Sequence, residues 1–140
     1  MGTRRKGREC AVQSLYQEEV RGGKSAPLPD AFWDEAEASP EARVFAERLG
    51  TGVREHLDEL DRLIATHSAH WRIERMAAVD KSILRMAAYE LVHCPDIPIK
   101  VTINEAVDIA KRFGTEESGS FINGILDSLA KAVRGEVHDE

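Results

Sequence analysis

Apolar residues recur every three or four positions along most of this 140-residue chain, and this period constrains the fold more than any other feature. A period near 3.6 residues places side chains on one stripe of an α-helix, whereas a half-buried β-strand needs strict alternation. The clearest stripe, over about residues 115–133, carries Phe121, Ile122, Ile125, Leu126, Leu129 and Val133. No segment alternates convincingly, so the sequence predicts an all-α protein.

The length of 140 residues predicts a single compact domain, and the period predicts about seven helices with mostly short connections. We expect them over about residues 9–21, 30–38, 40–67, 78–93, 102–113 and 115–133, with HSAHWRIERM as a bend or a further short helix. Ser39 before Pro40 is typical of a helix start, and Thr102 with Glu105 fits a capping box. Gly114 suits the end of a helix.

Four of the glycines in the predicted helices or their first turns lead to expectations about packing. Gly7 interrupts the arginine-rich start of the chain and predicts a frayed turn. Gly50 and Gly52 cost helix stability, on the order of 1 kcal/mol each, and predict close packing of a neighbouring helix. Gly124 predicts another tight contact.

Residues with catalytic or metal-binding chemistry form no recognisable site. His67 and His70 are three positions apart, but no third ligand follows at a metal-site spacing. His93 and Cys94 are neighbours on a helix and therefore point in different directions, so Cys94 is interpreted as a small buried apolar residue. The GTEESGS stretch lacks the lysine and the preceding strand of a phosphate-binding loop. We therefore expect no enzyme, no cofactor and no metal site.

The chain shows no feature of a membrane or secreted protein. Its longest apolar stretches are too short to span a bilayer, and no apolar segment follows the N-terminal cations. Two cysteines without a CxxC spacing need no oxidising compartment. A cytoplasmic location is the expectation.

Positive charge is concentrated at the start of an otherwise acidic chain, whose net charge is -6. The first eight residues hold Arg4, Arg5, Lys6 and Arg8 and no acid. Cations at a helix N-terminus oppose the helix dipole, and the planar arginine side chain suits phosphate. The pattern indicates an anionic partner, with RNA favoured over a membrane because the apolar stripe that follows looks core-directed. A solvated tail that only aids solubility is the alternative.

A family resemblance is carried by RRKGRECAVQSLYQ at the start and by VDKSILRMAAYELVHCPDIPIKVTINEAVDIAKRFGTEESGSFINGILDSLAK in the second half. Its most specific part is INEAVDIAKRFGTEESGSFINGILD, with Asn-Glu-Ala, Ala-Lys, Phe-Gly and Phe-x-Asn-Gly-x-Leu-Asp in one order. These stretches resemble the bacterial transcription antitermination family NusB. The resemblance covers nearly the whole chain and is weakest from Gly22 to Leu49.

The resemblance implies an all-α fold of two packed helical halves and a non-enzymatic role. NusB proteins pair with the ribosomal protein NusE, and the pair binds the boxA element of nascent ribosomal RNA leaders. This helps RNA polymerase pass terminators in an antitermination complex. Some members form homodimers that cover the RNA surface, so a homodimer is a further partner to consider. We expect one RNA-binding domain over residues 1–140, with a basic segment at 1–9, an N-terminal half at 9–70 and a C-terminal half at 71–134.

Matched residue by residue, the resemblance implies two binding surfaces. The RNA surface comprises Arg4, Arg5, Lys6, Arg8, Phe113, Gly114, Glu117, Ser118, Phe121 and Asn123. The surface for NusE comprises Tyr16, Asp80 and Glu90. An exposed Phe113 could stack on an unpaired base, worth about 1–3 kcal/mol, and Asn123 could read a base edge. Core packing of Phe113 and Phe121, helix bracing by Asn123 and simple solvation of Glu90 remain alternatives.

Two other functions stay open from the residues. A helical protein–protein adaptor would use the basic N-terminus on an acidic protein surface. The NusB fold also occurs fused to RNA methyltransferases, but this chain carries no methyl-donor-binding domain, so catalysis is not expected.

Overall fold

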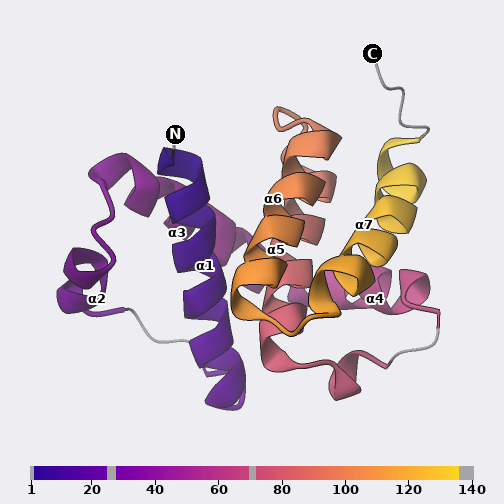
Figure 1. Ribbon diagram of the computed structural model, residues 1–140, viewed down its shortest axis with the longest axis horizontal. Helices are drawn as coiled ribbons and strands as arrows, with labels where there is room; N and C mark the ends of the chain where they lie inside the picture. Colours follow the sequence, from indigo (N-terminus) through magenta and orange to yellow (C-terminus); the bar gives the residue numbers. More distant parts are fainter. Residues whose placement is uncertain (1, 25–27, 70–71, 136–140) are drawn as a thin grey trace.

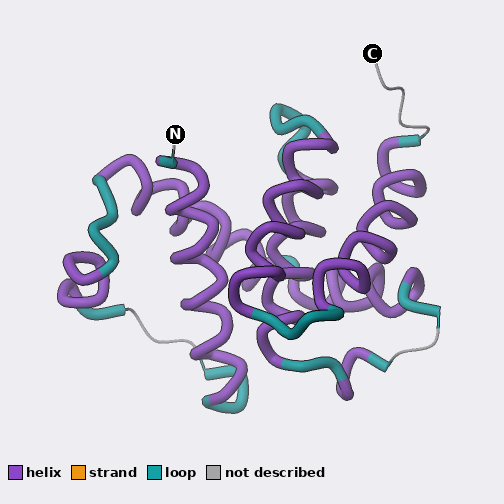
Figure 2. The backbone as a smooth tube through the Cα atoms, in the orientation of Figure 1, coloured by secondary structure: helices purple, strands orange, loops and turns teal. Residues whose placement is uncertain are grey.

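The computed structural model describes residues 2–24, 28–69 and 72–135, and these ranges hold seven α-helices and one short 3₁₀ helix (Figure 1). In chain order they are α1 (Thr3–Val20), α2 (Asp30–Glu35), α3 (Pro40–Glu55), α4 (Leu57–His67), η1 (Ile73–Arg75), α5 (Ala78–His93), α6 (Ile99–Phe113) and α7 (Ser118–Arg134). Figure 2 shows only helices and loops over the described residues. The all-α prediction is confirmed.

The helices form two groups that meet where α1 packs against α5 (Figure 1). In one group α1 packs most extensively against α3, and α2 lies at the outer edge of the molecule. In the other, α5, α6 and α7 pack against one another. Helix α4 packs mainly against α5 and α7, although the sequence analysis assigned it to the first half. The boundary predicted near residue 70 therefore leaves α4 in the N-terminal half, although α4 packs with the second group of helices.

One apolar core runs through both groups. Of the stripe predicted for α7, Ile122, Ile125, Leu126 and Leu129 are buried, and Phe121 and Val133 at its ends are partly buried. Cys10 and Cys94 are also buried, as expected for Cys94, and burial raises the pKa of both thiols. Of the helices in the described ranges, none is long and apolar enough to cross a membrane.

A buried ion pair holds the start of α1 to α5. Arg8 Nε donates to Glu90 Oε2 at 2.8 Å, and Arg8 Nη2 donates to Glu90 Oε1 at 3.0 Å. The two side chains are only 3% and 0% exposed. Thr102 of α6 adds a hydrogen bond from its hydroxyl to Glu90 Oε1 at 2.7 Å. The Glu90 carboxylate therefore joins α1, α5 and α6. Helix α1 also begins earlier than predicted, at Thr3 instead of about Glu9.

A second ion network fastens the other end of α1. Glu19 accepts hydrogen bonds from Lys81 Nζ at 2.6 Å and from Arg85 Nη1 at 2.9 Å, both on α5. Arg85 also donates to both carboxylate oxygens of Asp61 on α4, at 2.8 and 2.9 Å. The hydrogen bond from Lys81, followed by the one from Arg85, lowers the pKa of Glu19. Helix α1 is thus fixed to α5 near both of its ends.

The helix boundaries also depart from the predictions between α3 and α4 and at the start of α6. The predicted helix over residues 40–67 is two helices, because the backbone breaks at His56, with φ -120° and ψ 23°. The predicted capping box is wrong, since α6 begins earlier, at Ile99. Thr102 bonds instead to Glu90, and Glu105 bonds to α1. The helix start at Ser39 is confirmed, since its Oγ accepts the backbone N–H of Ala42 at 3.1 Å.

Gly7 marks the closest approach of α1 to α3. An added Cβ would lie 2.9 Å from both the carbonyl oxygen of Ala42 and the ring of Phe45. Such distances do not occur between a real Cβ and these atoms, so only glycine fits. The predicted fraying at Gly7 is therefore wrong, since the residue is a buried part of a regular helix.

The other glycines divide between close contacts and open surface. A Cβ on Gly52 would overlap the ring of Tyr89, which confirms the predicted close packing there. The three atoms nearest to a Cβ on Gly50 all belong to Arg54 of the same helix, so they give no sign of the predicted neighbouring helix there. A Cβ on Gly124 would meet no atom within 4 Å, so the predicted tight contact at Gly124 is wrong.

Replacing Arg8 tests how far the fold depends on the buried pair. We expect Arg8→Ala to lower the free energy of unfolding by about 3–5 kcal/mol, because Glu90 would stay buried without its cation. Urea denaturation measures this change. The control is Arg5→Ala, which removes a 41% exposed partner and should cost about 1 kcal/mol or less. Equal losses in the two variants would contradict the account.

Candidate nucleic-acid interface

The four N-terminal cations predicted to contact RNA do not all share one face of α1, although Arg4 and Arg8 both lie against the Phe45 ring. Arg4 is exposed, with its guanidinium carbon 4.7 Å from the centroid of the Phe45 ring. Lys6 is half-buried beside the end of α6. Arg5 and Arg8 are bound to acidic residues of other helices. The structure therefore leaves Arg4 and Lys6 as the more available charges.

Arg5 is neutralised by α6. Its Nε donates to Glu105 Oε1 at 3.0 Å, and its Nη2 donates to Glu105 Oε2 at 2.8 Å and to Asp108 Oδ2 at 2.7 Å. These bonds, above all those to Glu105, raise the pKa of Arg5. The two acids offset the positive charge that the sequence places here.

The predicted surface positions of Arg8 and Glu90 are wrong. Arg8 was expected to contact RNA, and Glu90 was expected either to contact a protein or to be solvated. Both are buried and bound to each other, so neither side chain faces a partner. The cause is a pairing across 82 positions of the sequence, which no local pattern reveals.

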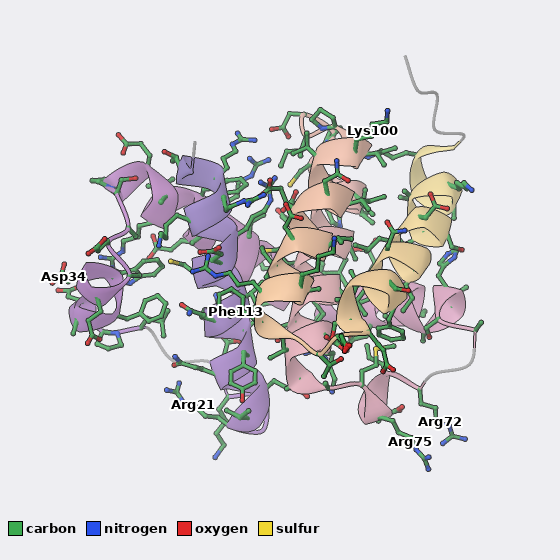
Figure 3. The ribbon with its side chains drawn as sticks, viewed as in Figure 1. Arg21, Asp34, Arg72, Arg75, Lys100 and Phe113 are labelled. Carbon is green, nitrogen blue, oxygen red and sulfur yellow. The ribbon has the colours of Figure 1, made fainter. Side chains whose placement is uncertain are left out.

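Lys6 and Phe113 line the same hollow, between α1, α2 and the end of α6. We call it the α1/α6 hollow; its volume is about 310 Å³. Its lining comprises Lys6, Glu9, Cys10, Gln13, Phe32, Glu35, Ala36, Arg112 and Phe113. Phe113 is 40% exposed, so it is not a core residue, and Figure 3 shows it at the end of α6 that lies beside α1.

Arg112 supplies a cation to this hollow that the sequence analysis missed. Its guanidinium carbon lies 5.1 Å from the centroid of the Phe113 ring, and its Nη1 donates to Glu9 Oε2 at 2.7 Å. The rest of its side chain is largely exposed. A cation beside an exposed aromatic ring can hold a phosphate while the ring stacks on a base. The Lys-Arg pair directly before Phe113 was the signal that would have found it.

A second hollow lies between the start of α5 and the start of α7. This α5/α7 hollow has a volume of about 140 Å³. Its lining comprises Arg75, Met76, Ala77, Asp80, Thr115, Glu117, Ser118 and Phe121. It therefore brings Asp80, predicted to contact a protein, together with three residues predicted to contact RNA. Arg75, also missed, is exposed on η1 and points away from the helices in Figure 3.

The turn of residues 114–117 connects the two hollows and is visible as a loop at the end of α6 in Figure 2. Ser118 is buried, and its Oγ accepts the backbone N–H of Thr115 at 2.9 Å. Gly114 ends α6 as predicted, while α7 begins at Ser118 rather than near Thr115. Ser118 and Gly114 therefore shape the turn, while Glu117 lies exposed on it.

The remaining predicted residues lie outside or at the edge of these hollows. Asn123 and Tyr16 are exposed and line neither hollow. Phe121 is half-buried against the core, which fits a packing role as well as contact. Asp80 Oδ1 is buried and accepts no hydrogen bond from the part of the chain that the structure describes.

The chain is similar to proteins of one family over nearly its full length. A family model described as the NusB family matches residues 5–131. The transcription antitermination protein NusB of Geobacter sulfurreducens is 53% identical over 134 residues, which covers 95% of this chain and 97% of the relative.

Two solved structures show the same fold. One, of T. maritima NusB, has a TM-score of 0.80 at 40% identity and covers 91% of this chain and 90% of that chain. The other is described as antitermination factors NusB and NusE in complex with dsRNA. It has a TM-score of 0.78 at 26% identity and covers 94% of this chain and 98% of that chain.

Substituting Gly114 tests the packing of the turn between the hollows. A Cβ there would lie 2.5 Å from Ser118 Oγ and 2.8 Å from the carbonyl oxygen of Ala110. We expect Gly114→Ala to lower the free energy of unfolding by about 1–3 kcal/mol through overpacking, measured by urea denaturation.

Gly124→Ala is the matched control, because its Cβ would enter open space on an exposed face of α7. Alanine should stabilise the helix there by up to about 1 kcal/mol. If both substitutions raise the free energy of unfolding, the close contacts of a Cβ at position 114 do not destabilise the fold.

Proposed function

The chain belongs to the NusB family of transcription antitermination proteins, and from this premise we propose that it binds the boxA element of nascent ribosomal RNA leaders together with NusE. Family membership also confirms the expectation of a non-enzymatic factor. The proposed complex acts with RNA polymerase in the cytoplasm and helps the polymerase pass terminators.

The observation that carries the proposal is the α1/α6 hollow. It holds Lys6, Arg112 and the exposed ring of Phe113 in one place. Single-stranded RNA is bound by cations that follow its phosphates and by aromatic rings that stack on its bases. Glu9 and Glu35 also line the hollow, so its attraction for RNA rests on two cations placed beside an exposed ring rather than on a net positive charge.

We propose that the RNA strand runs from the α1/α6 hollow along the 114–117 turn. Glu117, exposed on that turn, repels phosphate and so favours a strand whose bases face it. Arg75, exposed at the edge of the α5/α7 hollow, is a cation for the far end of the strand. Asn123 is exposed and offers both a donor and an acceptor to a base edge.

The proposed surface for NusE uses Tyr16 and Asp80. Tyr16 is an exposed aromatic on α1, of the kind that is enriched in protein interfaces. Asp80 Oδ1 is buried without a donor among the described residues, so a donor from a bound partner would satisfy it. Glu90, buried with Arg8, is left out of this surface.

Replacing Phe113 and Lys6 tests the RNA site. We expect Phe113→Ala to weaken binding of a labelled boxA RNA by about 5- to 150-fold, the loss of one stacked base at about 1–3 kcal/mol. Lys6→Ala should lower the slope of log affinity against log salt by about 0.7, the value for one phosphate of a single strand. Fluorescence anisotropy over a salt series, with and without NusE, measures both.

Lys131→Ala is the control for charge, because Lys131 is an exposed lysine near the far end of α7. It should leave affinity and slope nearly unchanged. Equal binding of boxA and scrambled RNA, even with NusE present, would reject the proposal and favour a protein adaptor. Unchanged binding by the Phe113 and Lys6 variants, with boxA still preferred, would show that the site lies elsewhere.

A further inference from the structure

We propose that His56, Glu59 and His93 form a binding site for a divalent transition-metal ion, for which Zn²⁺ is the best match. His56 lies at the break between α3 and α4, Glu59 in the first turn of α4, and His93 at the end of α5. One ligand atom from each residue lies within 4.8 Å of the other two. The site shares no residue with the α1/α6 or α5/α7 hollow.

The distances match what one small ion requires. His93 Nε2 is 2.8 Å from Glu59 Oε1, and His56 Nδ1 is 3.5 Å from the same oxygen. Donors at about 2.0–2.2 Å from a tetrahedral Zn²⁺ lie about 3.3 Å from one another. The two distances to Glu59 Oε1 are close to this value, and the two histidine nitrogens lie within 4.8 Å of each other.

The two imidazole rings must change their relative orientation on binding. They stack with centroids 3.9 Å apart and planes 27° from parallel. An imidazole coordinates a metal in the plane of its ring, so the two nitrogens converge on one ion only when one ring turns. Tyr89 stacks on His93, at 5.3 Å, while His56 is the more exposed of the two histidines, 38% against 28%. His56 is therefore the ring that turns.

The donor set fits Zn²⁺ in an open site. Two histidine nitrogens and one carboxylate oxygen are a recognised three-ligand set for zinc, with water as the fourth ligand. All three side chains are partly exposed, so an ion and its water have access. A bound ion would fasten the break between α3 and α4 to the end of α5 and stabilise the folded state.

The histidines of this cluster are not the pair, His67 and His70, that lies three positions apart in the sequence. His67 Nδ1 lies 2.8 Å from Ser128 Oγ, and His70 lies outside the described residues. His93 is separated from Glu59 by 34 positions, so spacing gave no signal of a shared site.

The test titrates the full-length, untagged chain with ZnCl₂ in competition with a chromogenic chelator. We expect one ion per chain, bound at least tenfold more weakly by His56→Gln and by His93→Gln. The matched control is His67→Gln, a histidine outside the cluster, which should bind as the unaltered chain does. Zn²⁺ should also raise the melting temperature of the unaltered chain and of His67→Gln, but not of His93→Gln.

Circular dichroism without metal verifies that each variant folds, which is expected because the substituted side chains are partly exposed. The absence of stoichiometric Zn²⁺ binding by the unaltered chain would overturn the proposal. So would equal losses in His67→Gln and His93→Gln, which would indicate scattered binding to surface histidines.

Discussion

The buried pair of Arg8 and Glu90 decides how the N-terminal helix is presented to solvent. Arg8 points into the interior. Arg4 lies one helical turn before it on the same face of α1, and both side chains lie against the Phe45 ring. Arg5, one residue after Arg4, points toward α6 and bonds to Glu105. Lys6 is then the cation beside Phe113. One internal interaction thus sets which positive charges remain for a partner.

Most of the helices could be predicted from the sequence, because the spacing of apolar residues along a helix can be read from neighbouring positions alone. The stripe of α7 was predicted correctly from this spacing, and the start of α3 from the adjacent Ser39 and Pro40. The break at His56 and the buried crossing at Gly7 were not, because each depends on packing that local spacing does not encode. A glycine that permits a close approach and one on an open surface, such as Gly124, have the same appearance in sequence.

The candidate site was predicted in part. Lys6 and Phe113, expected on one RNA surface, do line one hollow. Arg8 was misplaced because its partner is 82 positions away. Arg112 was missed because a single basic pair within a mixed-charge helix is a weaker signal than the four cations at the N-terminus. The cluster of cations in the sequence therefore predicts an anionic partner. Which of these cations can reach a partner depends on the ion pairs that form in the fold.

The central claim is that RNA contacts the α1/α6 hollow rather than the arginines paired inside the protein. Photocrosslinking of boxA RNA carrying 4-thiouridine, in the presence of NusE, followed by mass spectrometry of the crosslinked peptides, tests this most directly. Crosslinks at Phe113 and its neighbours, on the peptide that ends α6, are the result the account predicts. Crosslinks confined to α3 and α4, with none at the end of α6, would contradict it.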